Sequence, residues 1–153
     1  MGETIAIALL WLLVVNLGVV VGAGWYELRV VVPMWASAPP RSLTSPESGL
    51  SFWAWVTTGP LTLLTVANLV AASLTQGTAR PWWLAAGIII AVERIATFGY
   101  FVPTMIGLQR NQAAAAAEAA AKFARWRALN LARNIASTVA WLLALKALVM
   151  VGR

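Results

Sequence analysis

The sequence contains no cysteine and no histidine, and charged residues make up only 10% of its 153 positions. These absences exclude disulfides, cysteine nucleophiles, histidine bases, histidine-ligated haem, and metal sites built from thiolates or imidazoles. Any chemistry must therefore use carboxylates, tyrosine, arginine, amides or a bound cofactor. We expect no metal site.

Apolar residues are correspondingly abundant. They make up 61% of the chain, and its mean hydropathy is +0.79, which is typical of a membrane protein. A net charge of +6 would indicate nucleic acid as the partner of a soluble protein, but most Lys and Arg residues here lie at the ends of apolar runs, where they contact lipid headgroups. The expected partner is the lipid bilayer, and no nucleic acid.

Four apolar runs predict four membrane-spanning helices, at about residues 4–32, 52–74, 82–108 and 128–150. Pro33 is expected to end the first helix, and the turn-forming residues of 33–51 predict an exposed loop. The alanine-rich stretch 109–127 predicts an additional surface helix, a polar connection before the fourth span. The expected fold class is an all-α integral membrane four-helix bundle, with residues 1–153 forming one domain.

An even number of spans places both termini on the same side of the membrane. The first apolar run has no basic segment before it and no cleavage site after it, so we expect it to be a mature helix and not a signal peptide. Loop 33–51 and connection 109–127 share the opposite side, which carries more Lys and Arg. The positive-inside rule therefore predicts that both termini are non-cytoplasmic.

Polar side chains inside the spans fall near one end of the bundle. The span order places Glu27 and Tyr100 at the ends of the first and third helices, and Trp53 and Trp55 at the start of the second. All these helix ends belong to the same side of the membrane. Since an ionisable group in a bilayer is costly, each one requires a partner or a function.

Helical spacing indicates which side chains share a face. Asn130, Arg133 and Asn134 form a polar stripe on the fourth helix, and Glu93 shares a face with Tyr100 on the third. These positions predict a pocket in one leaflet. Its predicted catalytic residues are Glu27, Glu93 and Arg133, and its predicted substrate-binding residues are Trp25, Trp53, Trp55, Tyr100, Asn130 and Asn134. In the alternative interpretation, the same groups only hold the helices together.

Several short blocks resemble a known family. They are Gly24-Trp25-Tyr26-Glu27 with Val31-Val32-Pro33 and Trp35, then Thr97-Phe98-Gly99-Tyr100-Phe101-Val102-Pro103, Trp126-x-x-x-Asn130-x-x-Arg133, and Ala140-Trp141-Leu142-Leu143-Ala144-Leu145-Lys146-Ala147-Leu148. Together the blocks are similar to a bacterial family of small four-helix membrane proteins, mostly of unknown function, that is grouped with the anthrone oxygenases. The resemblance implies a location in the bacterial inner (plasma) membrane.

The resemblance also implies an activity, the oxidation of an activated polycyclic CH2 to a ketone by O2, with neither metal nor flavin as cofactor. Glu27 is then the first candidate base and Glu93 the second, while Arg133 with Asn130 or Asn134 stabilises the enolate. A membrane isomerase or cyclase acting on a lipophilic substrate would use the same residues. A structural or accessory membrane protein, or a homo-oligomer, is the non-enzymatic alternative.

Overall fold

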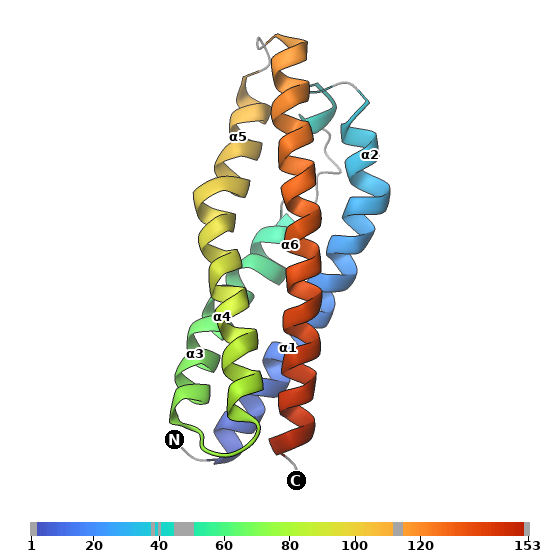
Figure 1. Ribbon diagram of the computed structural model, residues 1–153. Coiled ribbons are helices and arrows are strands. Elements are labelled where there is room, and N and C mark those ends of the chain that lie inside the picture. The colour runs from blue at the N-terminus through green and yellow to red at the C-terminus, as the bar shows by residue number, and fades with distance from the viewer. Residues whose placement is uncertain (1–2, 38, 40, 45–50, 112–114, 152–153) are drawn as a thin grey trace.

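The computed structural model describes residues 3–37, 39, 41–44, 51–111 and 115–151, and within them every regular element is a helix (Figure 1). Four long helices pack together, which confirms the predicted all-α four-helix fold. The start of α1 (Glu3–Tyr26) and the end of α6 (Ala116–Val151) lie at the same end of the bundle.

The first span is longer than the sequence predicts. From α1 the chain continues through a π-helical turn, η1 (Glu27–Val31), into α2 (Val32–Trp35). Pro33 lies in the first turn of α2, where a missing backbone N–H is tolerated. The expectation that Pro33 ends the helix is therefore wrong. In the predicted loop the described residues include a short 3-10 helix, η2 (Arg41–Thr44).

The second and third spans are also built from more than one type of helix. The second consists of a π-helix, η4 (Phe52–Thr58), followed by α3 (Gly59–Leu74). In the third, α4 (Arg80–Ala96) passes through the π-helical η5 (Thr97–Phe101) into α5 (Val102–Arg110). Gly77, in the turn between these two spans, has a φ of 101°, a conformation that glycine adopts without strain.

The fourth span, α6, is a single helix of 36 residues. The prediction of a separate surface helix at 109–127 is wrong, because the structure shows α5 reaching Arg110 and α6 beginning at Ala116. Residues 112–114 of that connection lie outside the described part. Between Ala116 and Val151 the sequence has neither glycine nor proline, so nothing ends the helix that the alanine-rich residues begin.

The spans are arranged so that each packs against two others. α6 packs against α1 and α4, and α3 completes the ring by packing against the same two helices. Leucines, alanines and Trp83 fill the core between them, while many large apolar side chains remain on the outside. All four spans are long and apolar enough to cross a bilayer: Thr4–Trp35, Phe52–Leu74, Arg80–Arg110 and Ala116–Val151. The chain is thus a small integral membrane protein.

Candidate functional site

Three of the four spans share a local structure, a π-helical turn followed by a proline. In each, the residue before the proline donates its backbone N–H to the carbonyl five residues earlier; these pairs are Val32 to Glu27, Gly59 to Ala54 and Val102 to Thr97. A proline has no N–H and its ring clashes with the carbonyl four residues back. The wider turn admits one extra residue and relieves this conflict.

The π-helical turns direct polar side chains into the bundle. Glu27 begins η1, Thr57 lies in η4 and Thr97 begins η5, and all three are buried. The Glu27 side chain is only 6% exposed. π-Helical turns are frequent at functional sites, because the extra residue re-aims nearby side chains.

Glu27 and Arg133 line the same cavity, which has a volume of about 170 Å³. Their charges interact, yet the two groups do not form a close ion pair, since Glu118–Lys122 is the only pair within 4.0 Å in the part of the chain that the structure describes. The Arg133 guanidinium instead stacks on Phe101, with its central carbon 4.6 Å from the ring centroid. Neither group therefore has an opposite charge within 4.0 Å among the described residues, although Glu27 interacts with Trp53 and Asn130.

Aromatic side chains form much of the cavity wall. Trp126 lies between other rings, with its centroid 6.4 Å from that of Trp35 and 6.1 Å from that of Phe101. Its indole N–H donates a hydrogen bond of 3.3 Å to the backbone carbonyl of Phe101. The indole is thus fixed by both packing and hydrogen bonding, and the cavity keeps a rigid apolar wall beside its two charged groups.

Asn130 lies beside Glu27 and is completely buried. Neither its amide nitrogen nor its amide oxygen has a hydrogen-bond partner of good geometry among the described residues. A buried amide left unpaired is destabilising. The Asn130 amide interacts with the Glu27 carboxylate and has no other partner among the described residues.

Glu93 lies behind this cavity and not in its wall. One of its carboxylate oxygens, Oε2, accepts a hydrogen bond of 2.8 Å from the Ser137 hydroxyl, while Oε1 has no partner among the described residues. Ser137 and Arg94 line a second hollow of about 20 Å³, which shares Arg133 with the first. This volume is sufficient for about one water molecule.

Two further predicted site residues connect the first span to the fourth. The Asn134 amide donates to the Gly24 carbonyl at 3.2 Å, and the Trp25 indole donates to the Thr138 hydroxyl at 3.1 Å. A Cβ atom at Gly24 would lie 2.3 Å from the Asn134 side-chain oxygen, so any larger residue would force the Asn134 amide to shift. Trp25 lines a different hollow from Glu27.

Of the remaining predicted site residues, the structure places only some in the cavity wall. Trp53 lines the cavity with Glu27 and Arg133, but Trp55 is 81% exposed and faces outward. Tyr100 is half-buried against Phe101 and is not among the residues that line the cavity. Several of the lining residues were not predicted from the sequence as part of the site: Trp35, Thr58, Thr97, Phe101, Val102, Met105, Ile106, Gln109 and Trp126.

Helical spacing held a signal for some of these residues. Trp126 precedes Asn130 by four positions, and Phe101 follows Thr97 by four, so each shares a face with a polar residue already singled out. The described residues contain no group of three or more acidic side chains that could hold a metal ion.

The fold and the site define a small integral membrane protein with a polar and aromatic cavity between its helices. Comparison with known protein families, with curated proteins and with solved structures finds no match to this chain. The cavity itself is therefore the basis for a function.

Proposed function

We propose that this protein is a membrane enzyme that deprotonates a lipophilic, enolisable substrate and allows the resulting carbanion to react with O2, as the resemblance to the anthrone oxygenases implies. The observation that carries the proposal is the shared cavity of Glu27 and Arg133. Both groups are placed beside aromatic side chains in a membrane span without a close ion pair between them. Ionisable groups in such positions commonly serve function.

Each polar group has a role in this reaction. The Glu27 carboxylate accepts a proton from the activated CH2. The Arg133 guanidinium and the Asn130 amide beside Glu27 stabilise the negative charge that develops on the enolate oxygen. O2 then bonds to the carbanion carbon, giving a hydroperoxide once it gains a proton. Loss of the second C–H proton with cleavage of the O–O bond leaves the ketone and one water, so that CH2 and O2 become C=O and H2O.

The cavity also suggests how the substrate enters. Val102 and Ile106 line it and are themselves about two-fifths exposed on the lipid-facing surface, at 40% and 39%. An apolar molecule would reach Glu27 between these side chains, near the level of the lipid headgroups. Because 170 Å³ is smaller than the roughly 300–1,000 Å³ of most ligand sites, only the reacting ring of a polycyclic substrate lies inside.

A non-enzymatic function is the second candidate, and one observation favours it. Several of the polar residues already have partners on neighbouring spans: Asn134 on Gly24, Trp25 on Thr138 and Glu93 on Ser137. If Glu27 and Arg133 act in the same way, they only stabilise helix packing. A membrane isomerase or cyclase would need the same carboxylate but no O2.

Oxygen consumption separates these candidates. The purified protein in lipid nanodiscs, supplied with a tricyclic anthrone, is expected to consume O2 and to form the quinone-type ketone faster than nanodiscs without protein. The Glu27→Gln variant should lose at least about a hundredfold of this rate, since general-base catalysis contributes 10²–10⁴-fold. Glu118→Gln, at an exposed acid paired only with Lys122, is the matched control and should retain it.

Two outcomes would contradict the proposal. Consumption of O2 no faster than in empty nanodiscs would remove the oxygenase, and an unchanged rate in a folded Glu27→Gln variant would remove the assigned base. Conversion of an enolisable substrate without O2 uptake would favour the isomerase or cyclase instead.

A further inference from the structure

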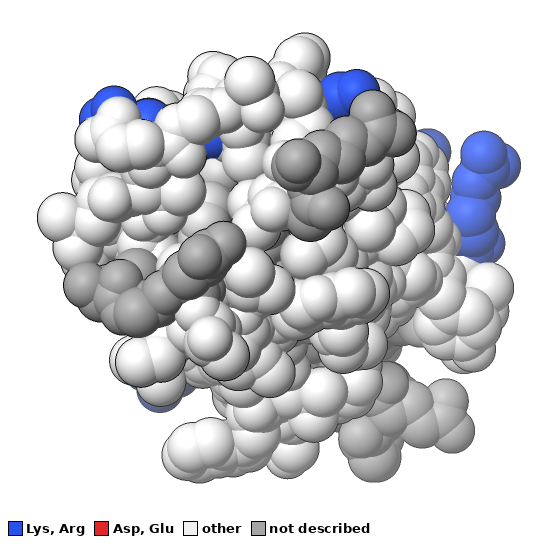
Figure 2. All heavy atoms as spheres, turned by 90° about the horizontal axis from the view of Figure 1, so that it is seen from below, with Lys and Arg blue, Asp and Glu red and all other residues white. Residues whose placement is uncertain are grey.

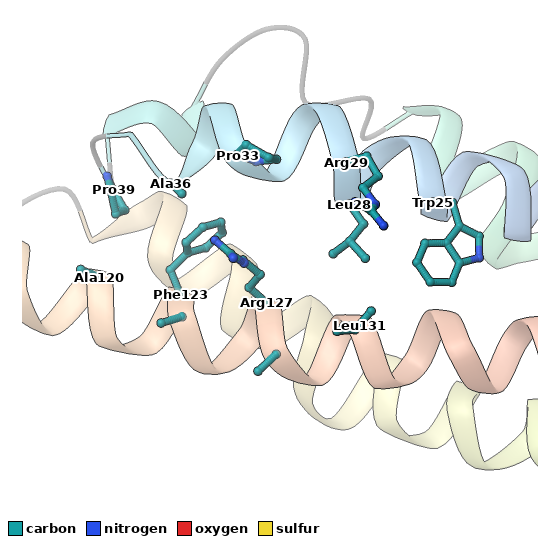
Figure 3. Close-up of a pocket in the computed structure, with 12 residues that line it drawn as sticks. Trp25, Leu28, Arg29, Pro33, Ala36, Pro39, Ala120, Phe123, Arg127 and Leu131 are labelled. Atoms are coloured by element: carbon teal, nitrogen blue, oxygen red, sulfur yellow. The ribbon is translucent and has the colours of Figure 1, made fainter.

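A larger hollow lies between the first span and α6, on the outside of the bundle. Its volume is about 890 Å³, and it is bounded by η1 and α2 on one side and by the first half of α6 on the other (Figure 3). We call it the outer groove. Its lining includes Trp25, Leu28 and Arg29 from the first span and Arg127 and Leu131 from α6.

The charge in the outer groove is entirely positive. Arg29 from η1 and Arg127 from α6 point into it from opposite walls (Figure 3), and no acidic side chain is among the described residues that line it. Both arginines are exposed, and neither forms an ion pair within 4.0 Å in the described part of the chain. Two guanidinium groups facing one space attract an anion, and each can form bidentate hydrogen bonds to phosphate oxygens.

The depth of the outer groove in the membrane follows from the surface of α6. Its exposed large apolar side chains extend from Leu129 to Val149, which is about 30 Å at 1.5 Å per residue and matches the hydrocarbon thickness of a bilayer. Just before Leu129 the exposed side chains become basic, with Arg127 closest to the apolar band. Arg127 therefore lies at the level of the lipid headgroups, and Arg29 faces Leu131 at the edge of the apolar band (Figure 3).

Apolar side chains continue the outer groove from the arginines toward the bilayer centre. Trp25 and Leu28 project from the first span, and Leu131 faces them from α6 (Figure 3). The opposite end of the bundle has basic side chains at its rim (Figure 2). A molecule with an anionic head and an apolar tail, in the orientation of a membrane lipid, thus matches the outer groove at both ends.

We propose that the outer groove binds one acidic membrane lipid, with its phosphate between Arg29 and Arg127 and the upper part of an acyl chain against Trp25, Leu28 and Leu131. This lipid site is independent of the proposed oxygenase, because the outer groove and the Glu27 cavity share no lining residue. Basic side chains at the membrane surface each strengthen the binding of anionic lipid, and a pair of them increases affinity by about tenfold or more.

Native mass spectrometry of the detergent-solubilised full chain tests the proposal. With phosphatidylglycerol and phosphatidylcholine of equal chain length supplied together, the protein should retain one phosphatidylglycerol at least tenfold more strongly. The double variant Arg29→Gln/Arg127→Gln should lose this preference. Arg125→Gln is the matched control, because Arg125 is also exposed on α6 but does not line the outer groove.

Further measurements separate the effects of charge, acyl chain and self-association. Arg29→Lys/Arg127→Lys keeps both charges and should keep most of the preference. Free glycerol phosphate should not displace the lipid, because the acyl chain also binds in the outer groove; displacement would contradict the assigned acyl-chain contacts. If the unaltered protein retains the two lipids equally, that result alone would overturn the proposal. So would an equal loss in Arg125→Gln, or a dimer of this chain that the double variant separates and that carries no lipid.

Discussion

The guanidinium of Arg133 stacks on the ring of Phe101, with 4.6 Å between the guanidinium carbon and the ring centroid. This contact joins α6 to the π-helical turn of the third span and holds the cation in the wall of the Glu27 cavity. The ring thus gives the guanidinium a cation–π contact at the cavity wall. An arginine held in this way has fewer conformations to lose when a ligand binds.

The contact between Arg133 and Phe101 should be measurable as a coupling energy. We expect Phe101→Leu and Arg133→Gln, combined in a double-mutant cycle, to show about 1 kcal/mol of interaction in the free energy of unfolding, as for other cation–π pairs. Reversible unfolding in mixed micelles gives the four values. The cycle of Phe101→Leu with Arg125→Gln is the control and should give no coupling; equal coupling in both cycles would show that the contact is not specific.

Gly24 should be intolerant of any side chain. Gly24→Ala places a methyl group 2.3 Å from the Asn134 side-chain oxygen, and overpacking of this kind costs about 1–3 kcal/mol. Gly22→Ala, on the same helix with nothing within 4 Å of the added atom, is the matched control and should be neutral. Unfolding measurements test both. The double variant Gly24→Ala/Asn134→Ala should recover part of the loss, and its failure to do so would contradict the assigned clash.

Pro103 should matter more for activity than for stability. Pro103→Ala restores a backbone N–H and allows η5 to return to α-helical hydrogen bonding, which would rotate α5 relative to α4 by about 100°. Met105 and Ile106 would then no longer face the cavity. We expect O2 turnover to fall at least about tenfold with a smaller effect on the unfolding midpoint, because the gain in helix propensity offsets part of the packing that Met105 and Leu108 lose.

Pro81→Ala provides the comparison for this variant. Pro81 also lies in the first turn of a helix, but no π-helical turn precedes it. In Pro81→Ala, both the O2 turnover and the unfolding midpoint should stay close to those of the unaltered protein. If both proline variants reduce turnover equally, the π-helical turn is not what positions the site.

The predicted orientation can be tested directly, because the chain has no native cysteine to interfere. Ser37→Cys and Thr78→Cys place single thiols at exposed positions near opposite ends of the bundle. With both termini outside the cytoplasm, a membrane-impermeant maleimide should label Thr78→Cys in intact cells and Ser37→Cys only after permeabilisation. The reverse pattern would show that the positive-inside rule gives the wrong answer for this chain.

The four helices were predictable from the sequence because run length and apolar composition depend only on the thickness of a bilayer. The positions where the helices end were less predictable. At Pro33 the sequence suggests termination, yet the structure continues through a π-helical turn, since neighbouring helices and local adjustment compensate for the lost hydrogen bond. The continuous helix from Ala116 to Val151 was predictable, because no residue between them breaks a helix. The change from alanine-rich to apolar composition instead suggested two separate helices.

The sequence predicted at which depth in the membrane the site residues lie, but not for every residue which side of its helix faces the cavity. Span order alone brings Glu27 and Arg133 to one level, and both line the cavity. The extra residue in η5 changes the helical phase, so Phe101 lines the cavity in place of Tyr100. Trp55 was a different case: two residues after Trp53, it lies on the far side of any helix, and spacing alone excluded it.

The length of α6 has a mechanical consequence. Its 36 residues make a rod of about 54 Å, well beyond the roughly 30 Å of the hydrocarbon layer, so the turns from Ala116 to Lys122 stand in the aqueous phase. Unlike the other three spans, this rod has no proline and no π-helical turn to absorb a twist. Because no break in the helix lies between Ala116 and Arg133, a rotation of α6 at its N-terminal end would also turn Arg133.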